Sequence, residues 1–254
     1  MSAPLRIAWL TTGRGPGSYG ALEYLLAAIE RGLPVEIAVA FVNRRPGEYE
    51  ATDRLLGLLA EHRVPSETLS SVRFRKERSG DRSRAGEPLP AWRAEFDEAA
   101  AARLAPYSFD LAVMFGYMLI ATEPLYGRFP IINDHPALPD GPTGTYQQVI
   151  AELIRTGATE GGCMYHLVTG DLDRGPVLSY CRYPIPAGPP VDLPAGAGRA
   201  TIEALPLYGE IRASGVARER PLLVETLRAL AEGRLEVPPP EPLDLTDAVE
   251  TAIA

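Results

Sequence analysis

The sequence predicts an α/β fold, a Rossmann-like, doubly wound sheet of mostly parallel strands, on three observations. Short apolar runs alternate with longer segments in which apolar residues recur every three to four positions. Glycine, proline and polar clusters separate these segments. The chain has 254 residues, 46% of them hydrophobic and 23% charged, which suits one sizeable soluble domain. This alternation favours a parallel sheet covered by helices, and we expect a single domain over 1–254.

The predicted core, about residues 4–185, begins with two strand–helix units. Their spacing predicts strands over 5–11 and 35–42 and helices over 20–32 and 50–63. Further along, the same patterns predict helices and strands in turn: a helix over 91–105, strands over 109–115 and 129–133, a helix over 146–157, and strands over 162–169 and 176–185 joined by a short loop.

Two segments fall outside this core pattern. Residues 71–91 hold six basic and three acidic residues with little apolar content, which predicts a flexible surface insertion. The C-terminal extension, 186–254, begins with a stretch rich in proline and glycine. It then predicts helices near 199–213 and 218–232 and an extended arm that ends in a short amphipathic turn.

Composition excludes several classes of protein. A net charge of −8 argues against binding to nucleic acid, which favours a basic surplus. Cys163 and Cys181, the two cysteines, make neither a disulfide framework nor a zinc cluster, so no metal is expected. No apolar run approaches the roughly 20 residues of a membrane helix, and no signal peptide is visible. We therefore expect a cytoplasmic, reduced protein without a membrane partner.

The segment after the first strand raises a dinucleotide hypothesis. Gly15, Gly17 and Gly20 spell G-x-G-x-x-G, and the second strand runs into Asn43-Arg44-Arg45, whose arginines suit the 2′-phosphate of NADP. The same glycines would also allow a sharp turn whose amides bind any anion at a helix N-terminus. Lys76 is the only lysine, which excludes a Walker A loop and a catalytic Tyr-x-x-x-Lys.

Candidate catalytic residues follow two of the predicted strands. Asn133 and His135 are two positions apart where a buried strand ends, and the carboxyl ends of strands in open α/β sheets face the active crevice. Asp171 and Asp173 lie in the loop between two strands, where they form either a plain turn or a carboxylate partner for the imidazole.

Three segments together resemble the signatures of a known family. FGYMLIAT, INDHPALP and YHLVTGDLDRGPVL are similar, in this order, to motifs of the folate-dependent formyltransferases, most closely of those that act on glycinamide ribonucleotide in purine biosynthesis. The resemblance runs from about Leu5 to Ile185. It implies an enzyme that transfers a formyl group from 10-formyltetrahydrofolate to an amine without a metal, with Asn133, His135 and Asp173 as the catalytic residues.

The same resemblance implies two binding regions. The folate is expected against the main chain of Met118, Leu119 and Ile120, near Arg93, and on the loop segment formed by Val168, Thr169, Gly170 and Asp171. The phosphate and ribose of the acceptor are expected at Gly13, Arg14, Gly15, Gly17, Ser18 and Glu219. Leu119 replaces an arginine common in the family, and the asparagines of the family's glycine loop are missing here.

Three other functions stay open on the sequence. A formyltransferase acting on an amino sugar or another amine is the first, because the loop after His135 departs from the family pattern. An NADP-dependent oxidoreductase using the glycine segment is the second, and a non-catalytic binder of folate or nucleotide is the third. The expected partner is a small phosphorylated amine, and a homodimer is left open.

Overall fold

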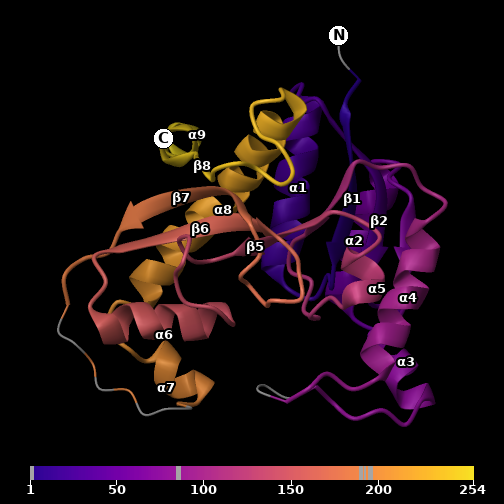
Figure 1. Ribbon diagram of the computed structural model, residues 1–254, viewed down its shortest axis with the longest axis horizontal. Coiled ribbons are helices and arrows are strands. Elements are labelled where there is room, and N and C mark those ends of the chain that lie inside the picture. The colour runs from indigo at the N-terminus through magenta and orange to yellow at the C-terminus, as the bar shows by residue number, and fades with distance from the viewer. Residues whose placement is uncertain (1–2, 84–86, 189–190, 192, 194–196) are drawn as a thin grey trace. The chain divides into compact units, whose positions relative to one another are not determined.

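The computed structural model describes residues 3–83, 87–188, 191, 193 and 197–254, and its elements are labelled in Figure 1. The described chain is α/β with mostly parallel strands, which confirms the predicted fold class. It divides into two compact units: Met1–Asn133 with Val168–Gly170, and Asp134–Leu167 with Asp171–Ala254. The expectation of one domain over 1–254 stays a prediction.

The first unit contains a parallel sheet with the strand order β3-β2-β1-β4-β5. Its strands are β1 (Leu5–Thr11), β2 (Val35–Val42), β3 (Ser66–Thr68), β4 (Leu111–Met114) and the start of β5 (Ile131–His135). The chain order runs outward from β1 on one side and from β4 on the other. The reversal point between β1 and β4 is where open α/β sheets bind ligands, beyond the carboxyl ends of the strands.

In its described residues this unit has five helices: α1 (Pro16–Glu30), α2 (Glu50–Glu61), α3 (Ser71–Glu77), α4 (Trp92–Leu104) and α5 (Glu123–Tyr126). Helix α1 begins four residues before the predicted start at Gly20. Pro16 occupies its first turn, where a fixed φ suits the helix and the missing N–H is not needed. Gly17 and Gly20 are therefore helical, and only Gly13 and Gly15 precede the helix.

The expectation of a flexible surface insertion over 71–91 is wrong at its start. Residues 71–77 form α3, capped by the Ser70 hydroxyl, which accepts a hydrogen bond from the main-chain N–H of Arg73. Phe74 is buried and packs edge-on against Phe96 with ring centroids 5.3 Å apart. Phe74 attaches this charged segment to the hydrophobic core, and the average composition of the segment does not reveal that contact. Residues 84–86 of this segment lie outside the described residues.

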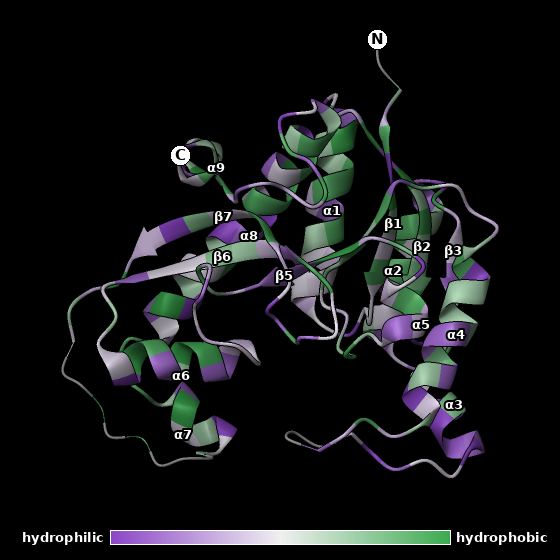
Figure 2. Ribbon diagram, in the orientation of Figure 1, coloured by the Kyte–Doolittle hydropathy of each residue, from purple (hydrophilic) through white to green (hydrophobic). Residues whose placement is uncertain are grey.

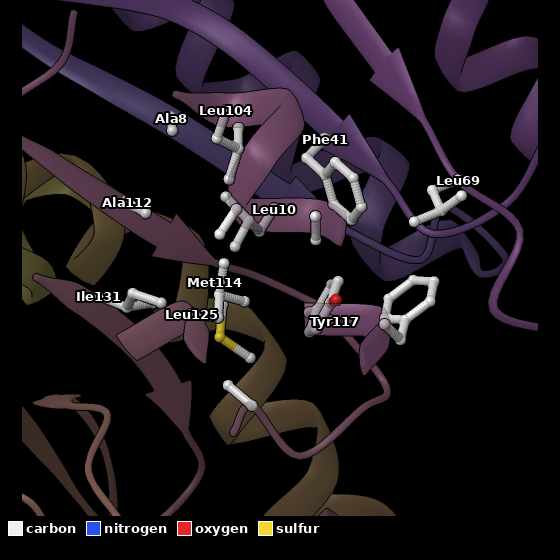
Figure 3. Packing of buried hydrophobic residues seen from close by; sticks show 14 of the residues in the cluster. Ala8, Leu10, Phe41, Leu69, Leu104, Ala112, Met114, Tyr117, Leu125 and Ile131 are labelled. Atoms are coloured by element: carbon white, nitrogen blue, oxygen red, sulfur yellow. The ribbon is translucent and has the colours of Figure 1, made fainter. Parts of the chain in front are cut away.

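A hydrophobic cluster lies between the sheet of the first unit and helices α4 and α5. Leu10, Phe41 and Met114 from three strands lie within it, as Figure 3 shows. In Figure 2 the strands β1 and β2 are coloured largely as hydrophobic, as expected for strands buried on both faces. This rigid core supports the loops that follow β1 and β4.

The described part of the second unit contains the strands β6 (Glu160–Leu167), β7 (Val177–Pro184) and β8 (Leu243–Asp244). β6 and β7 pair antiparallel, with Cys163 directly opposite Cys181, and β8 pairs parallel to β7. Its helices are α6 (Tyr146–Thr156), α7 (Arg199–Glu203), α8 (Tyr208–Ala231) and α9 (Thr246–Ile253). Thr145 and Gln148 form a capping box at the start of α6, and Gly157 ends the helix in the left-handed conformation.

Helix α8 differs from the prediction of two helices near 199–213 and 218–232. It runs unbroken from Tyr208 to Ala231 and contains Pro221. An interior proline costs a helix about 3 kcal/mol, because it removes a hydrogen bond and its ring clashes with the preceding turn. Here Leu222, Leu223 and Leu227 are fully buried around it, and their packing outweighs that cost. The predicted C-terminal arm contains β8 and α9.

Candidate active site

The two loops at the reversal point of the first unit are hydrogen-bonded to each other. The main-chain N–H of Met118 donates to the Thr12 hydroxyl at 2.8 Å, and the N–H of Thr12 donates to the Gly116 carbonyl at 3.1 Å. The glycine segment that follows β1 and the segment Met118–Ile120 that follows β4 therefore share one support. Gly13, Arg14 and Gly15 of the predicted acceptor-binding residues, and Met118–Ile120 of the predicted folate-binding residues, lie on these neighbouring loops.

The glycine segment turns sharply before α1. Gly13 has a φ of +66°, which favours glycine, and its carbonyl accepts a hydrogen bond from the Thr52 hydroxyl at 3.2 Å. Gly15 caps α1 without a side-chain hydrogen bond. A Cβ atom built on Gly15 or Gly17 would meet no atom within 4 Å, so the space beside both residues is open. The first-turn amides of α1 therefore keep the capacity to bind an anion.

Ser18 and Gly13 are buried, whereas Arg14 and Gly17, also predicted to bind the acceptor, are exposed. A Cβ atom on Gly116, whose φ is +64°, would lie 2.2 Å from the Ser18 hydroxyl. Gly116 is therefore required for the close approach of the β4 loop to α1. Arg14 is exposed, and its guanidinium lies 4.2 Å from the centre of the Tyr49 ring.

The predicted folate segment exposes apolar side chains. Met118 is 72% exposed and Ile120 is 40% exposed, whereas the rest of this region is mostly buried. The Met118 N–H is already bound to Thr12, and the Ile120 carbonyl accepts a hydrogen bond from Arg93. Two of the main-chain groups expected to face the folate are thus used in hydrogen bonds within the protein. The main chain of Leu119 and the exposed side chains of Met118 and Ile120 remain available to a ligand.

Arg93 is buried within its helix rather than solvated on the surface. Burial lowers the pKa of its guanidinium, and the nearby Asp97 carboxylate opposes that change. Asp97 in turn accepts hydrogen bonds from the N–H and hydroxyl of Thr122 at 2.6 and 2.7 Å. Arg93 and Asp97 therefore hold both ends of the segment between Ile120 and Thr122.

The remaining part of the predicted folate loop, Val168–Gly170, also belongs to the first unit. The Val168 N–H donates to the carbonyl of Ile131 at 2.8 Å, which ties the loop to β5. Asp171, which follows it in the chain, belongs to the second unit and is exposed. Leu172, which follows the predicted folate segment, is 50% exposed and is another large apolar side chain that faces solvent.

The second unit brings a carboxylate close to two imidazole rings. Asp173 Oδ2 lies 3.9 Å from His135 Nδ1, and Asp173 Oδ1 lies 3.8 Å from His166 Nε2. The two rings are nearly perpendicular, with centroids 6.1 Å apart, and both are buried. Asp173 adopts a left-handed φ of +55° and accepts a hydrogen bond from the Gly144 N–H at 3.0 Å. Asn133, the third predicted catalytic residue, precedes His135 by two positions in β5.

Backbone carbonyls determine which ring nitrogens carry hydrogen. His135 Nε2 lies 2.8 Å from the Pro142 carbonyl, and His166 Nδ1 lies 2.9 Å from the carbonyl of Leu167. Because a carbonyl only accepts, each of these nitrogens donates, and the opposite nitrogen of each ring faces Asp173. A proton on either facing nitrogen would be attracted to the carboxylate. Burial lowers the pKa of His166, which favours its neutral form.

His166 is a functional candidate that the sequence reasoning missed, although it lies in the quoted segment YHLVTGDLDRGPVL. Its proximity to Asp173 depends on the turn between β6 and β7, which the residue spacing alone does not reveal. Asp134 was also missed. Burial and the neighbouring Glu219 raise the pKa of its carboxyl well above the ordinary value. Glu219, predicted to hold the ribose, is buried and paired with Arg212 at 2.7 Å.

The depressed pKa of His166 predicts a pH dependence of stability. As the pH falls below about 6.5, the unfolded chain takes up a proton at this position before the folded protein does, so the free energy of unfolding falls. We expect urea unfolding between pH 8 and pH 5 to show a shallower loss in His166→Gln than in the parent. Equal slopes in His166→Gln and the parent would contradict this assignment.

Two features of the described residues bear on the sequence predictions. No group of three or more His, Cys, Asp or Glu side chains among them has the arrangement of a metal site. None of their helices is both long enough and apolar enough to cross a bilayer.

Comparison with known proteins adds to this geometry. Residues 59–189, more than half of the chain, match the formyl transferase family model. The chain belongs to the formyl transferase family. This family member is 35% identical over 95 residues to phosphoribosylglycinamide formyltransferase from Haemophilus influenzae, a match that covers 36% of this chain and 43% of that protein. The matches span less than half the length of such curated relatives.

Solved structures resemble this family member over most of its length. Glycinamide ribonucleotide transformylase 1 from Symbiobacterium toebii has a TM-score of 0.64 at 24% identity, over 92% of this chain and 91% of that one. Formyltetrahydrofolate deformylase from Burkholderia mallei has a TM-score of 0.61 at 18% identity, over 91% and 66%. At these identities the likeness shows the fold. The oxidoreductase alternative receives no support from these comparisons.

Proposed function

We propose that the protein transfers the formyl group of 10-formyltetrahydrofolate to the primary amine of a small phosphorylated acceptor, with glycinamide ribonucleotide as the first candidate. The observation that carries the proposal is the Asp173 carboxylate, only 10% exposed, within 4 Å of the rings of His135 and His166. The formyl transferase family and the names of its matched relatives support the reaction class. With that acceptor the enzyme would serve purine biosynthesis in the cytoplasm.

In the proposed reaction the neutral amine attacks the formyl carbon, and the carbonyl electron pair moves to oxygen. The oxyanion of the tetrahedral intermediate requires donors that are already in place. The Asn133 amide supplies one donor, and the protonated His135 ring adds positive charge nearby, which the Asp173 carboxylate stabilises. The amine loses its proton, N10 of the folate gains one, and the carbon–N10 bond breaks to release tetrahydrofolate and the formylated amine.

The folate would contact the exposed side chains of Met118 and Ile120 and the Val168–Asp171 segment. An apolar surface suits the flat pteridine ring. Covering the solvent-exposed side chains of Met118 and Ile120 would bury apolar surface and so favour binding. Arg93 acts in this proposal by positioning Ile120 through its carbonyl.

The acceptor phosphate would bind where α1 begins. Gly13 and Gly15 shape the turn, Gly17 and Ser18 supply main-chain N–H groups, and Arg14 supplies charge. Such helix N-termini favour anions because their first N–H groups lack partners within the helix.

One observation favours a second candidate acceptor. The Glu219 carboxylate is held by Arg212 at 2.7 Å, and Arg212 lies 4.3 Å from the centre of the Tyr146 ring. A glutamate in an ion pair is a poorer acceptor for ribose hydroxyls than a free one. A different phosphorylated amine, such as an amino sugar, is therefore the alternative acceptor for the same chemistry.

The function is tested by a transfer assay with 10-formyl-5,8-dideazafolate, in which absorbance follows the deformylated product. We expect turnover that depends on glycinamide ribonucleotide. Turnover with an amino sugar alone would replace the acceptor and keep the chemistry. Release of product without any acceptor would indicate hydrolysis, the activity named for the Burkholderia mallei structure. Absence of folate-dependent turnover in every arm would overturn the proposal.

A further inference from the structure

The segment Gly141–Gly144, which follows β5, contacts both the His135 ring and the Asp173 carboxylate through its main chain. The Pro142 carbonyl accepts a hydrogen bond from His135 Nε2 at 2.8 Å, and the Gly144 N–H donates to Asp173 Oδ2 at 3.0 Å. A single residue separates these two main-chain groups in the chain. The conformation of this short segment therefore determines how the carboxylate lies relative to the ring.

The distances show that the segment, and not a direct bond, holds the pair in place. His135 Nδ1 and Asp173 Oδ2 are 3.9 Å apart, which is too long for a hydrogen bond. The contacts of the same two side chains with the segment are 2.8 and 3.0 Å long, within the normal range. Displacement of a reacting group by about 1 Å can cost about 10²-fold in rate, so the conformation of this segment matters for activity.

Arg174 is bound to the start of the segment. It follows Asp173 directly in the loop between β6 and β7, and its Nη1 donates to the Gly141 carbonyl at 3.0 Å. The Gly141 N–H donates in turn to the Leu138 carbonyl at 2.9 Å, which closes a tight turn. Arg174 is exposed, so it contributes this contact without being part of the core. Two consecutive residues of one loop are thus hydrogen-bonded to the two ends of the segment.

Gln148 fixes the end of the segment through the start of α6. Its Oε1 accepts a hydrogen bond from the Thr145 N–H at 2.8 Å, and the Thr145 hydroxyl accepts one from the Gln148 N–H at 3.4 Å. This capping box orders the residue that directly follows Gly144. Gly144 has a φ of +101°, and a Cβ atom there would lie 2.6 Å from Gln148 Oε1. The glycine and the cap together direct the Gly144 N–H to the carboxylate.

We propose that Arg174 and Gln148 are positioning residues that hold the segment Gly141–Gly144 as a main-chain clamp between His135 and Asp173. Arg174 acts at the start of the clamp and Gln148 at its end, and neither side chain touches the reacting atoms. This inference rests on the proposed function only in taking the imidazole and the carboxylate as the reactive groups.

The first test needs neither folate nor acceptor. The Nε2 proton of His135 is bound to the Pro142 carbonyl and buried, so it should give a slowly exchanging NMR resonance, assigned by its loss in His135→Gln. Arg174→Met removes the donor to the clamp, and this proton should then exchange with water about tenfold faster, the effect of one hydrogen bond to a charged group. Arg174→Lys keeps a donor and should restore slow exchange. Arg155→Met removes an exposed arginine of α6 and is the matched control.

The second test measures kinetics in the transfer assay. Arg174→Met and Gln148→Ala should each lower kcat about tenfold, with KM for both substrates within about twofold of the parent, because the clamp acts on the reacting groups and not on binding. Gln148→Glu keeps the capping box and should recover parent kcat. Gln147→Ala changes the neighbouring residue, which lies outside the box, and should leave kcat unchanged.

The outcomes separate the clamp from the proposed function. Parent-like proton exchange and parent kcat in both Arg174→Met and Gln148→Ala would overturn the clamp. A loss of kcat that neither Arg174→Lys nor Gln148→Glu restores would also overturn it, since it would reflect general destabilisation. Faster exchange in Arg174→Met, in a protein that transfers no formyl group, would keep the clamp and reject the function.

Discussion

Asp173→Asn is expected to reduce formyl transfer by about 10²–10⁴-fold while the protein stays folded. That is the range for loss of positioned acid–base assistance. The carboxylate is the only anion within 4 Å of either buried imidazole among the described residues. Asparagine tolerates the left-handed backbone of this position, where φ is +55°, so the substitution changes the charge and spares the turn. The assay with 10-formyl-5,8-dideazafolate measures the effect, and circular dichroism checks the fold.

Asp140→Asn is a well-matched control for that experiment. Asp140 also has a left-handed φ, +62°, but it is exposed and lies outside the histidine cluster. We expect parent activity from it. Should Asp173→Asn retain more than about a tenth of parent turnover, the carboxylate has no part in the chemical step, and the mechanism must rest on His135 and Asn133 without it.

Phe74→Ala is expected to cost about 3–5 kcal/mol of stability, the usual effect of removing a buried phenylalanine. For a chain of this size that corresponds to a fall in Tm of roughly 6–20 °C. Phe74 packs on Phe96 and lies beneath the Arg78 guanidinium, which is 3.5 Å from the centre of its ring. Scanning calorimetry or thermal unfolding by circular dichroism measures the shift.

The control lies in the same helix. Lys76 is exposed, and alanine is a good helix former, so Lys76→Ala should change stability by no more than about 0.5 kcal/mol. If both variants unfold at the same temperature as the parent, helix α3 does not pack on the core, and the original expectation of a loose surface segment holds. The same packing argues that deletion of 72–90 would destabilise the protein, because the Trp92 indole N–H also donates to the Asp81 carbonyl at 2.9 Å.

The strands of the first unit were the most predictable part of the fold. The predicted bounds of 5–11 and 35–42 agree with β1 and β2. A short, continuous apolar run between turn residues is typical of a buried strand. The prediction failed where the structure depends on one residue whose character differs from that of its neighbours along the chain. Phe74 anchors a charged segment, and Pro221 lies inside a helix that packing keeps whole. Tertiary contacts decided both cases, and they are absent from a local pattern.

The candidate site also combines residues that the sequence predicted with residues that only the tertiary structure brings together. His135 and Asp173 were paired by resemblance, and the structure brings them within ion-pair distance. His166 is 31 residues beyond His135, and nothing in its neighbours along the chain indicates that it faces the same carboxylate. The burial of Arg93 and the pairing of Glu219 with Arg212 were likewise beyond reach, since each depends on a partner distant in the chain or on another turn of helix. The folate and acceptor contacts of these residues stay predictions.

The cross-strand cysteines of β6 and β7 can report the rate at which these two strands separate. Cys163 and Cys181 are the only thiols in the chain, and both are fully buried. Contact with Cys181, together with burial, raises the pKa of the Cys163 thiol, so it is unreactive in the closed state. A thiol reagent such as Ellman's reagent therefore labels the protein only when this strand pair separates. In excess reagent the labelling rate equals the rate of that separation, which can be followed at these two native thiols with and without folate or phosphate.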